Sequence, residues 1–206
     1  MPRISRSDSI RASTRSLMEF DPSVLCMGLG VTDPGRVFGT TDGLVEEFGE
    51  QRVFETPTSE LALTGVGVGL ALGGFRVLHS HQRLDFALLA VDQLVNAAAK
   101  WKFMYGEDFH VPYLVRLIVG RGWGQGPTHS QNLESWFSHV PGLRVIVPAT
   151  PQDMFDSIQM LGTTRDPIIL IEHRWLHSVE AEVDPGAGPV SANLGPVIHG
   201  ASGKAA

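Results

Sequence analysis

Six short runs of nearly continuous apolar residues alternate with longer segments of helical periodicity along the chain. The runs cover residues 24–27, 52–54, 76–78, 113–119, 143–147 and 168–171. Strands that are covered on both faces of a parallel sheet have such unbroken apolar content. Their alternation with helices is typical of βαβ units. The pattern therefore predicts an α/β fold, with a mainly parallel sheet sandwiched by helices.

The helical segments differ in how clearly their ends are marked. Residues 85–105 give the clearest pattern, because Asp85 is placed to cap a helix and Gly106 to end it. A second helix is predicted over 152–161. The apolar positions in the first 18 residues can share one face of a first helix. The same segment carries four arginines among serines, with one acidic residue, so it also resembles an organelle transit peptide.

Residues 59–74 contain five glycines, each of which would weaken an isolated helix by up to ~1 kcal/mol relative to alanine. If this segment is helical, small side chains at these positions indicate that another helix or a ligand approaches its backbone closely.

The composition excludes several classes of protein. Of 206 residues, 16 are Lys or Arg and 22 are Asp or Glu, and the net charge of −6 argues against nucleic acid as a partner. No apolar run approaches the roughly 20 residues of a membrane-spanning helix. The single cysteine, Cys26, excludes an intramolecular disulfide and suits a reducing compartment. We therefore expect a soluble, cytoplasmic protein, whose residues from about 179 onward form a tail or linker rich in Pro, Gly, Ala and Ser.

The histidines raise the hypothesis of a metal hydrolase. His79 and His81 share one face of a predicted strand, and His173 and His177 have the spacing of two zinc ligands on a helix. Neither pair has the flanking residues of a zinc motif, so hydrogen-bonded or solvated histidines are expected instead.

Two further segments carry candidate chemistry. The glycine-rich stretch 120–126 follows a strand and could bind an anion, but it lacks the spacing of phosphate-binding or dinucleotide motifs. We interpret it as an active-site loop, with His129 just beyond it. Glu60 falls in the first turn of the glycine-rich segment, where a helix dipole favours a negative charge. Capping by Ser59, with Glu60 as a favourable charge, is the simpler alternative.

Taken together, the segments resemble a known family. The matching stretches are residues 52–60 (RVFETPTSE), 81–86 (HQRLDF), 91–100 (VDQLVNAAAK), 128–131 (THSQ), 141–148 (PGLRVIVP) and 166–173 (DPIILIEH). In this order and spacing they resemble the beta subunit of thiamine-diphosphate-dependent 2-oxo acid dehydrogenases, in the transketolase superfamily. The resemblance implies a pyrimidine-binding domain over residues 1–180. Residues 181–206 would then be a tail or truncated linker that stops before the family's C-terminal domain.

The resemblance also assigns roles to four residues. Glu60 is implied as the carboxylate that contacts the ring nitrogen of the cofactor's aminopyrimidine, and Phe86 as the aromatic residue packed against that ring. Gln82 is implied as a further cofactor-binding residue. His129 is implied as the histidine that assists proton transfer. The activity implied is decarboxylation of a 2-oxo acid, or cleavage of a ketose, with transfer of the acyl or ketol unit to an acceptor.

Departures from the family pattern affect the partner and the substrate. The sequence contains no Gly-Asp-Gly motif, so the ligands of magnesium and the diphosphate are expected on an alpha-type partner subunit, in a heterotetramer. Leu29 stands where the family usually has an acid, and residues 79–84 replace an aromatic-rich segment, which indicates a changed substrate. The alternative reading is a non-catalytic scaffold or regulatory relative of such a subunit.

Overall fold

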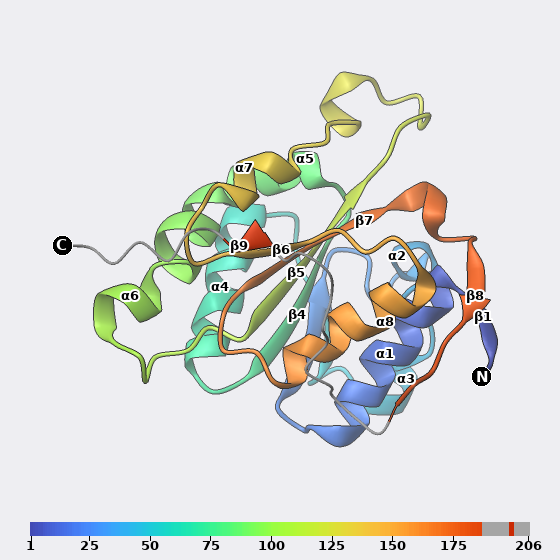
Figure 1. Cartoon of the computed structure of the whole chain (residues 1–206), viewed down its shortest axis with the longest axis horizontal. Helices are drawn as coiled ribbons and strands as arrows, with labels where there is room; N and C mark the ends of the chain where they lie inside the picture. The colour runs from blue at the N-terminus through green and yellow to red at the C-terminus, as the bar shows by residue number, and fades with distance from the viewer. Residues whose placement is uncertain (187–197, 200–206) are drawn as a thin grey trace.

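The fold is built on a seven-stranded sheet, in which six neighbouring strands run parallel (Figure 1). The computed structural model describes residues 1–186 and the backbone of residues 198–199. The strand order is β3-β2-β4-β5-β7-β6-β9, and β9 pairs with β6 in the antiparallel sense. The bounds are β2 (Val24–Gly28), β3 (Val53–Glu55), β4 (Arg76–His81), β5 (Tyr113–Val119), β6 (Arg144–Ile146), β7 (Ile168–His173) and β9 (Ile198–His199). The predicted parallel sheet is confirmed, with a strand at each of the six apolar runs.

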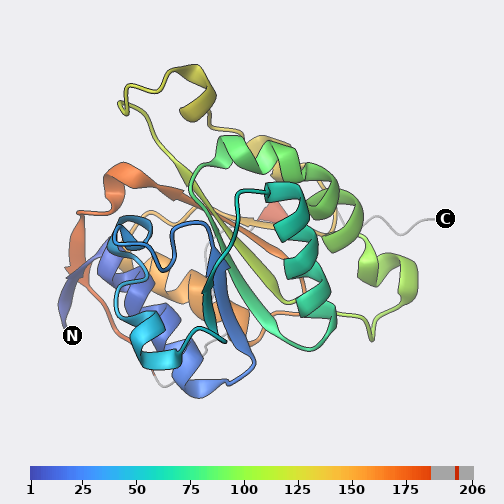
Figure 2. The same ribbon diagram turned by 180° about the vertical axis from the view of Figure 1, so that it is seen from behind.

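Helices cover both faces of the sheet, and a separate apolar cluster lies under each layer. On one face lie α1 (Arg6–Phe20) and α8 (Pro151–Gln159), which pack against each other. On the other face, α4 (Glu60–Leu72) lies beside the helical segment 84–105 (Figure 2). The short helices are α2 (Arg36–Gly39), α3 (Leu44–Phe48) and α7 (Glu134–Ser138).

The N-terminal segment forms the predicted first helix. Asp8 donates its backbone N–H to the Ser5 hydroxyl at 3.1 Å, which caps α1. Ile10, Leu17 and Met18 are buried in the cluster beneath it. The second predicted helix is also confirmed, because α8 begins with a capping box of Thr150 and Asp153. No helix among residues 1–186 is long and apolar enough to cross a membrane.

The prediction of one continuous helix over 85–105 is wrong. The segment consists of α5 (Leu84–Ala87), a 3-10 turn (Leu88–Ala90), a π-helical turn (Gln93–Ala98) and α6 (Trp101–Tyr105). The most deeply buried apolar positions follow at intervals of three and then four residues, at 84, 87, 90, 94 and 98. An interval of three is the repeat of a 3-10 helix, so the backbone tightens first and widens later to bury each of these side chains. Asp85 lies inside α5 and does not cap it.

The C-terminal segment stays packed beyond the predicted start of the tail. Residues of β8 (Glu180–Glu182) pair with β1 (Arg3–Ser5) in a separate antiparallel sheet. Val183 is buried and donates its N–H to the Pro2 carbonyl at 3.0 Å. Cross-strand pairing with the N-terminus therefore orders residues in which the sequence shows no periodicity. The remainder of the expected tail, residues 187–197 and 200–206, lies outside the described residues.

One glycine of α4 is required by close packing, but its neighbour is a side chain of strand β5 and not the helix or ligand that the glycine-rich pattern indicated. A Cβ at Gly67 would lie 2.6 Å from Cε2 of Tyr113. Tyr113 is fully buried, and its hydroxyl is 2.6 Å from His79 Nδ1, so its ring has little freedom to move. We expect Gly67→Ala to lower the free energy of unfolding by about 1–3 kcal/mol, the usual effect of overpacking. Urea unfolding of the purified chain measures this loss.

Gly69 in the same helix supplies the matched control. A Cβ at Gly69 would meet nothing within 4 Å. Gly69→Ala should therefore raise the free energy of unfolding by up to about 1 kcal/mol, because alanine favours the helix. Equal effects of the two substitutions would contradict the packing argument.

Candidate functional site

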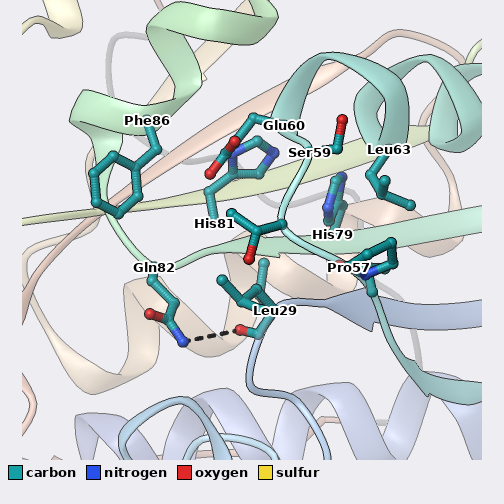
Figure 3. A pocket seen from close by; sticks show the side chains of 12 residues that line it. Leu29, Pro57, Ser59, Glu60, Leu63, His79, His81, Gln82 and Phe86 are labelled. Atoms are coloured by element: carbon teal, nitrogen blue, oxygen red, sulfur yellow. Dashed lines mark hydrogen bonds between the residues drawn. The ribbon is translucent and has the colours of Figure 1, made fainter.

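A pocket opens at the edge of the sheet where the parallel strands end and α4 begins (Figure 3). It contains about 310 Å³ of empty space, part of which is open to solvent. The lining residues come from the segment 56–60 before and within the start of α4, from residues 79–82 at the end of β4, and from Leu29, Leu63 and Phe86. Ligands of open α/β sheets bind at this carboxyl edge of the strands, so the pocket has the position of a functional site.

Glu60 is the first residue of α4 and places a carboxylate in the pocket. The alternative capping role of Ser59 is wrong, because its side chain makes no hydrogen bond to the helix. The Glu60 side chain is half-buried, and among the described residues it has no hydrogen-bonding partner. The first turn of a helix is a favourable place for an acidic side chain. The group is therefore available to a molecule bound in the pocket.

Gln82 and Phe86 line the same pocket. The Gln82 amide donates from Nε2 to the Leu29 carbonyl at 3.3 Å, the contact drawn in Figure 3. Phe86 is half-buried and meets the ring of His129 edge-on, with the ring centroids 5.3 Å apart. The structure thus brings Glu60, Gln82 and Phe86 to one pocket. His129 is not among the lining residues and contacts Phe86 from the end of a 3-10 turn (Pro127–His129).

His79 and His81 form the floor of the pocket, and this role was missed in the sequence. Both are buried, and their ring centroids lie 4.5 Å apart. His81 Nε2 lies 3.3 Å from the Thr64 hydroxyl. Burial lowers the pKa of His79 well below its usual value and that of His81 to about 4, so both imidazoles are neutral at neutral pH. His81 Nδ1 is buried without a hydrogen-bonding partner.

The geometry gives the metal hypothesis no support. His79 is hydrogen bonded to Tyr113, and His173 accepts the backbone N–H of Trp175 at 3.3 Å through its Nδ1. His173 ends β7 and His177 follows a 3-10 turn, so these two do not share a helix face. Within residues 1–186, no group of three His, Cys, Asp or Glu side chains could hold a metal ion.

A buried ion pair lies next to the pocket and contacts one of its lining residues, Ser80. Arg116 in β5 donates from Nη2 and Nε to the two carboxylate oxygens of Glu172, at 2.8 and 3.0 Å. Its Nη1 donates to the hydroxyl of Ser80, a pocket residue, at 3.1 Å, and its Nη2 also donates to Thr40 at 3.0 Å. Burial opposes ionisation of Glu172, but Arg116 outweighs it and holds the pKa of Glu172 well below its usual range. The sequence signal is a charged residue inside one apolar run, Arg116, and one directly after another, Glu172.

Fold and pocket together define an α/β ligand-binding domain of the open-sheet class. Residues 3–178 match the transketolase pyrimidine binding domain, and the chain belongs to this family. The family resemblance inferred from the motifs is confirmed.

Curated relatives include beta subunits of dehydrogenases. The chain is 37% identical over 174 residues to the 2-oxoisovalerate dehydrogenase subunit beta of Bacillus subtilis (strain 168), covering 84% of this chain and 53% of the relative. It is 36% identical over 180 residues to the acetoin:2,6-dichlorophenolindophenol oxidoreductase subunit beta of Cupriavidus necator, covering 82% and 53%. The chain therefore spans about half the length of the curated relatives it matches. A solved structure titled "Split gene transketolase, inactive beta4 tetramer" supports the fold, with a TM-score of 0.69 at 16% identity, over 90% of this chain and 56% of that one.

Proposed function

We propose that this chain is the pyrimidine-binding, beta-type component of a two-component thiamine-diphosphate enzyme. The reaction we assign is decarboxylation of a 2-oxo acid, or cleavage of a ketose, followed by transfer of the acyl or ketol unit to an acceptor. The observation that carries this proposal is that Glu60 and Phe86, the two residues whose roles are most specific to the cofactor's ring, line one pocket. The name of the 2-oxoisovalerate dehydrogenase relative favours the 2-oxo acid.

The pocket fits the aminopyrimidine end of thiamine diphosphate. Phe86 and Leu63 offer apolar surface to a flat ring, and Glu60 offers a hydrogen-bond acceptor. The unpartnered Nδ1 of His81 is a further polar atom on the pocket floor. A carboxylate in the pocket would repel a diphosphate, so the charged end suits a different set of ligands. This supports magnesium and diphosphate ligands on an alpha-type partner.

When bound, thiamine diphosphate supplies an electron sink for carbanion chemistry. Glu60 would hold the ring nitrogen of the aminopyrimidine through a shared proton, and Phe86 would pack against that ring. Gln82 holds the loop at Leu29 through its hydrogen bond. His129 has its Nδ1 3.1 Å from the Thr128 hydroxyl, which leaves Nε2 to exchange a proton with the substrate.

Cofactor binding tests the proposal. We expect isothermal titration calorimetry to detect no saturable binding of thiamine diphosphate and Mg²⁺ to the purified chain alone. Saturable binding should appear once a partner chain carrying Gly-Asp-Gly and a downstream Asn is added, because the diphosphate then has its ligands. Turnover of 2-oxo acids by the mixture gives the activity. Tight binding to the isolated chain, or none to the mixture, would contradict the two-component proposal.

The expected assembly is a heterotetramer of two such chains with two alpha-type chains, located in the cytoplasm. Sedimentation analysis of the mixture measures its size. The scaffold alternative, in which the chain supports a partner without taking part in the chemistry, would require activity to survive simultaneous replacement of Glu60, Phe86 and His129. Glu60 and Phe86 line one pocket and His129 contacts Phe86, which supports the catalytic role.

A further inference from the structure

The loop between β5 and α7 carries His129 and extends beyond the rest of the fold (Figure 1). Residues 120–131 contain no helix or strand apart from the 3-10 turn that ends at His129. The bonds of this turn are local, because the backbone N–H groups of His129 and Ser130 donate to the carbonyls of Gly126 and Pro127, each at 3.3 Å. Local bonds shape the turn but do not fix its place relative to the pocket. Contacts with other parts of the chain must do so.

Trp123 holds the turn by the backbone of His129. The indole Nε1 donates to the His129 carbonyl at 2.7 Å, across six residues of the loop. Trp123 is half-buried, although most of the surrounding loop is exposed. A short hydrogen bond joins a rigid, planar side chain to the backbone here. The position of His129 therefore depends on the position of the indole.

The indole ring itself is fixed against the sheet. A Cβ at Gly120, the residue directly after β5, would lie 2.8 Å from Cζ2 and Cη2 of Trp123, so the ring lies against the backbone there. The guanidinium carbon of Arg83, which follows β4, lies 4.2 Å from the centroid of the ring. Arg83 also lies 5.6 Å from the ring centroid of Phe38. Stacking of this kind orders both the cation and the ring. The indole thus contacts residues that follow two neighbouring strands.

Asp85 holds the chain on the other side of His129. Its Oδ1 accepts two hydrogen bonds from Gln131, from Nε2 at 2.8 Å and from the backbone N–H at 3.3 Å. Asp85 is buried in α5, where it does not cap the helix. A buried carboxylate needs such donors, and the same two bonds fix the residue that supplies them. Asp85 therefore ties Gln131 to α5.

The two attachments bring the His129 ring to the pocket. Phe86, which lines the pocket, directly follows Asp85 in α5. Its ring and that of His129 lie with their centroids 5.3 Å apart and their planes at 87°. One aromatic pair of this kind is a weak contact by itself. Because Trp123 fixes the chain at residue 129 and Asp85 fixes it at residue 131, the imidazole stays beside Phe86.

We propose that Trp123 and Asp85 are positioning residues, which together hold the His129 imidazole at the edge of the pocket. Neither is among the residues that line the pocket, so both act through His129. The positioning is a property of this chain alone, whereas its use in proton transfer rests on the proposed function. Misplacing a reacting group by about 1 Å can lower a rate about 100-fold, so loss of either attachment should affect turnover.

NMR of the purified chain with 13C-labelled histidine tests the positioning without cofactor or partner. The imidazole C–H signals of His129 are identified by their loss in His129→Gln, and they should shift in Phe86→Leu because they sense that ring. We expect Trp123→Phe to shift them as well, since phenylalanine keeps a ring at this position but cannot donate to the His129 carbonyl. Trp136→Phe is the matched control. Trp136 is 59% exposed on α7, so this variant should leave the signals in place.

Asp85 provides a second pair of variants, which decides the question if Trp123→Phe fails to fold. Asp85→Ala removes the acceptor of both bonds from Gln131 and should shift the His129 signals. Asp85→Asn keeps an oxygen that can accept these bonds, so its signals should stay closer to those of the wild type.

Turnover shows whether the enzyme uses this positioning. In the assembled enzyme, Trp123→Phe should lower kcat by about 10- to 100-fold while the dissociation constant of thiamine diphosphate stays within about twofold. Signals that shift as expected, in a chain that shows no turnover with any partner, would support the positioning and contradict the proposed function. The positioning proposal is overturned if the His129 signals of the folded Trp123→Phe or Asp85→Ala variants match those of the wild type. It is equally overturned if an active wild-type assembly loses less than about twofold in kcat on Trp123→Phe.

Discussion

Glu60→Gln is expected to lower kcat of the assembled enzyme by about 100-fold or more, the contribution typical of acid–base catalysis by a positioned side chain. Glutamine keeps the size of the side chain but cannot share a proton with the ring nitrogen of the cofactor. Because the Glu60 side chain is half-buried and makes no hydrogen bond within the described structure, its replacement should leave the free energy of unfolding nearly unchanged. Steady-state turnover with a 2-oxo acid, measured beside thermal unfolding, separates the two effects.

Glu50→Gln is the matched control for this measurement. Glu50 is an exposed carboxylate that precedes β3, outside the pocket, so turnover should stay within about twofold of the wild type. A loss of less than about tenfold in Glu60→Gln would contradict the assigned role, since it would fall below the range of general acid–base effects.

Glu172→Ala is expected to lower the free energy of unfolding by about 3–5 kcal/mol, because it leaves the charge of Arg116 buried without a counterion. Both side chains of this pair are fully buried. Replacing the two together, as Arg116→Met with Glu172→Leu, removes the charges and should recover most of the loss. Urea unfolding compares both variants with the wild type.

A surface ion pair provides the contrast. Glu180 lies 3.4 Å from Arg3 on the outside of the molecule, and both side chains are more than half exposed. Glu180→Ala should therefore change the free energy of unfolding by less than about 1 kcal/mol. If Glu172→Ala were as mild as Glu180→Ala, the buried pair could not be a main support of the pocket floor.

The buried pair of Arg116 and Glu172 makes the stability of the fold depend on pH. Because the pKa of Glu172 is lowered in the folded state, the pair stabilises the fold fully above the usual glutamate pKa of about 4.3. That stabilisation is lost as the pH falls below this value toward the lower pKa of the folded state. The variant without both charges should lose less stability than the wild type between pH 6 and pH 3, at about 25 °C.

Much of the sheet and of the pocket was predictable from the sequence, for physical reasons. The central strands are buried on both faces, so their apolar runs are unbroken and stand out. Glu60, Gln82 and Phe86 lie in short segments that carry the family resemblance, and the structure places all three around one pocket. The activity, its dependence on an alpha-type partner and the role of His129 stay predictions.

Other features depend on contacts that no local pattern encodes. The winding of residues 84–105 follows buried positions set by the neighbouring α4, and β8 is ordered by pairing with a strand near the N-terminus. Phe38, Arg83 and Arg174 meet only because separate loops end at one edge of the sheet. Arg116 and Glu172 are 56 residues apart, so in the sequence Arg116 is an isolated charge within one apolar run and Glu172 an isolated charge at the end of another.

Two parts of the pocket wall would respond differently to redesign, because Ser80 in one of them accepts a hydrogen bond from Arg116. Ser80 shares a strand with His79 and His81, and a larger side chain there would disturb the charged pair on which the fold depends. The stretch 56–59, by contrast, makes no hydrogen bond to that pair among the residues described. Attempts to alter ligand preference should therefore begin with this stretch, where variation in shape carries little risk of unfolding the protein.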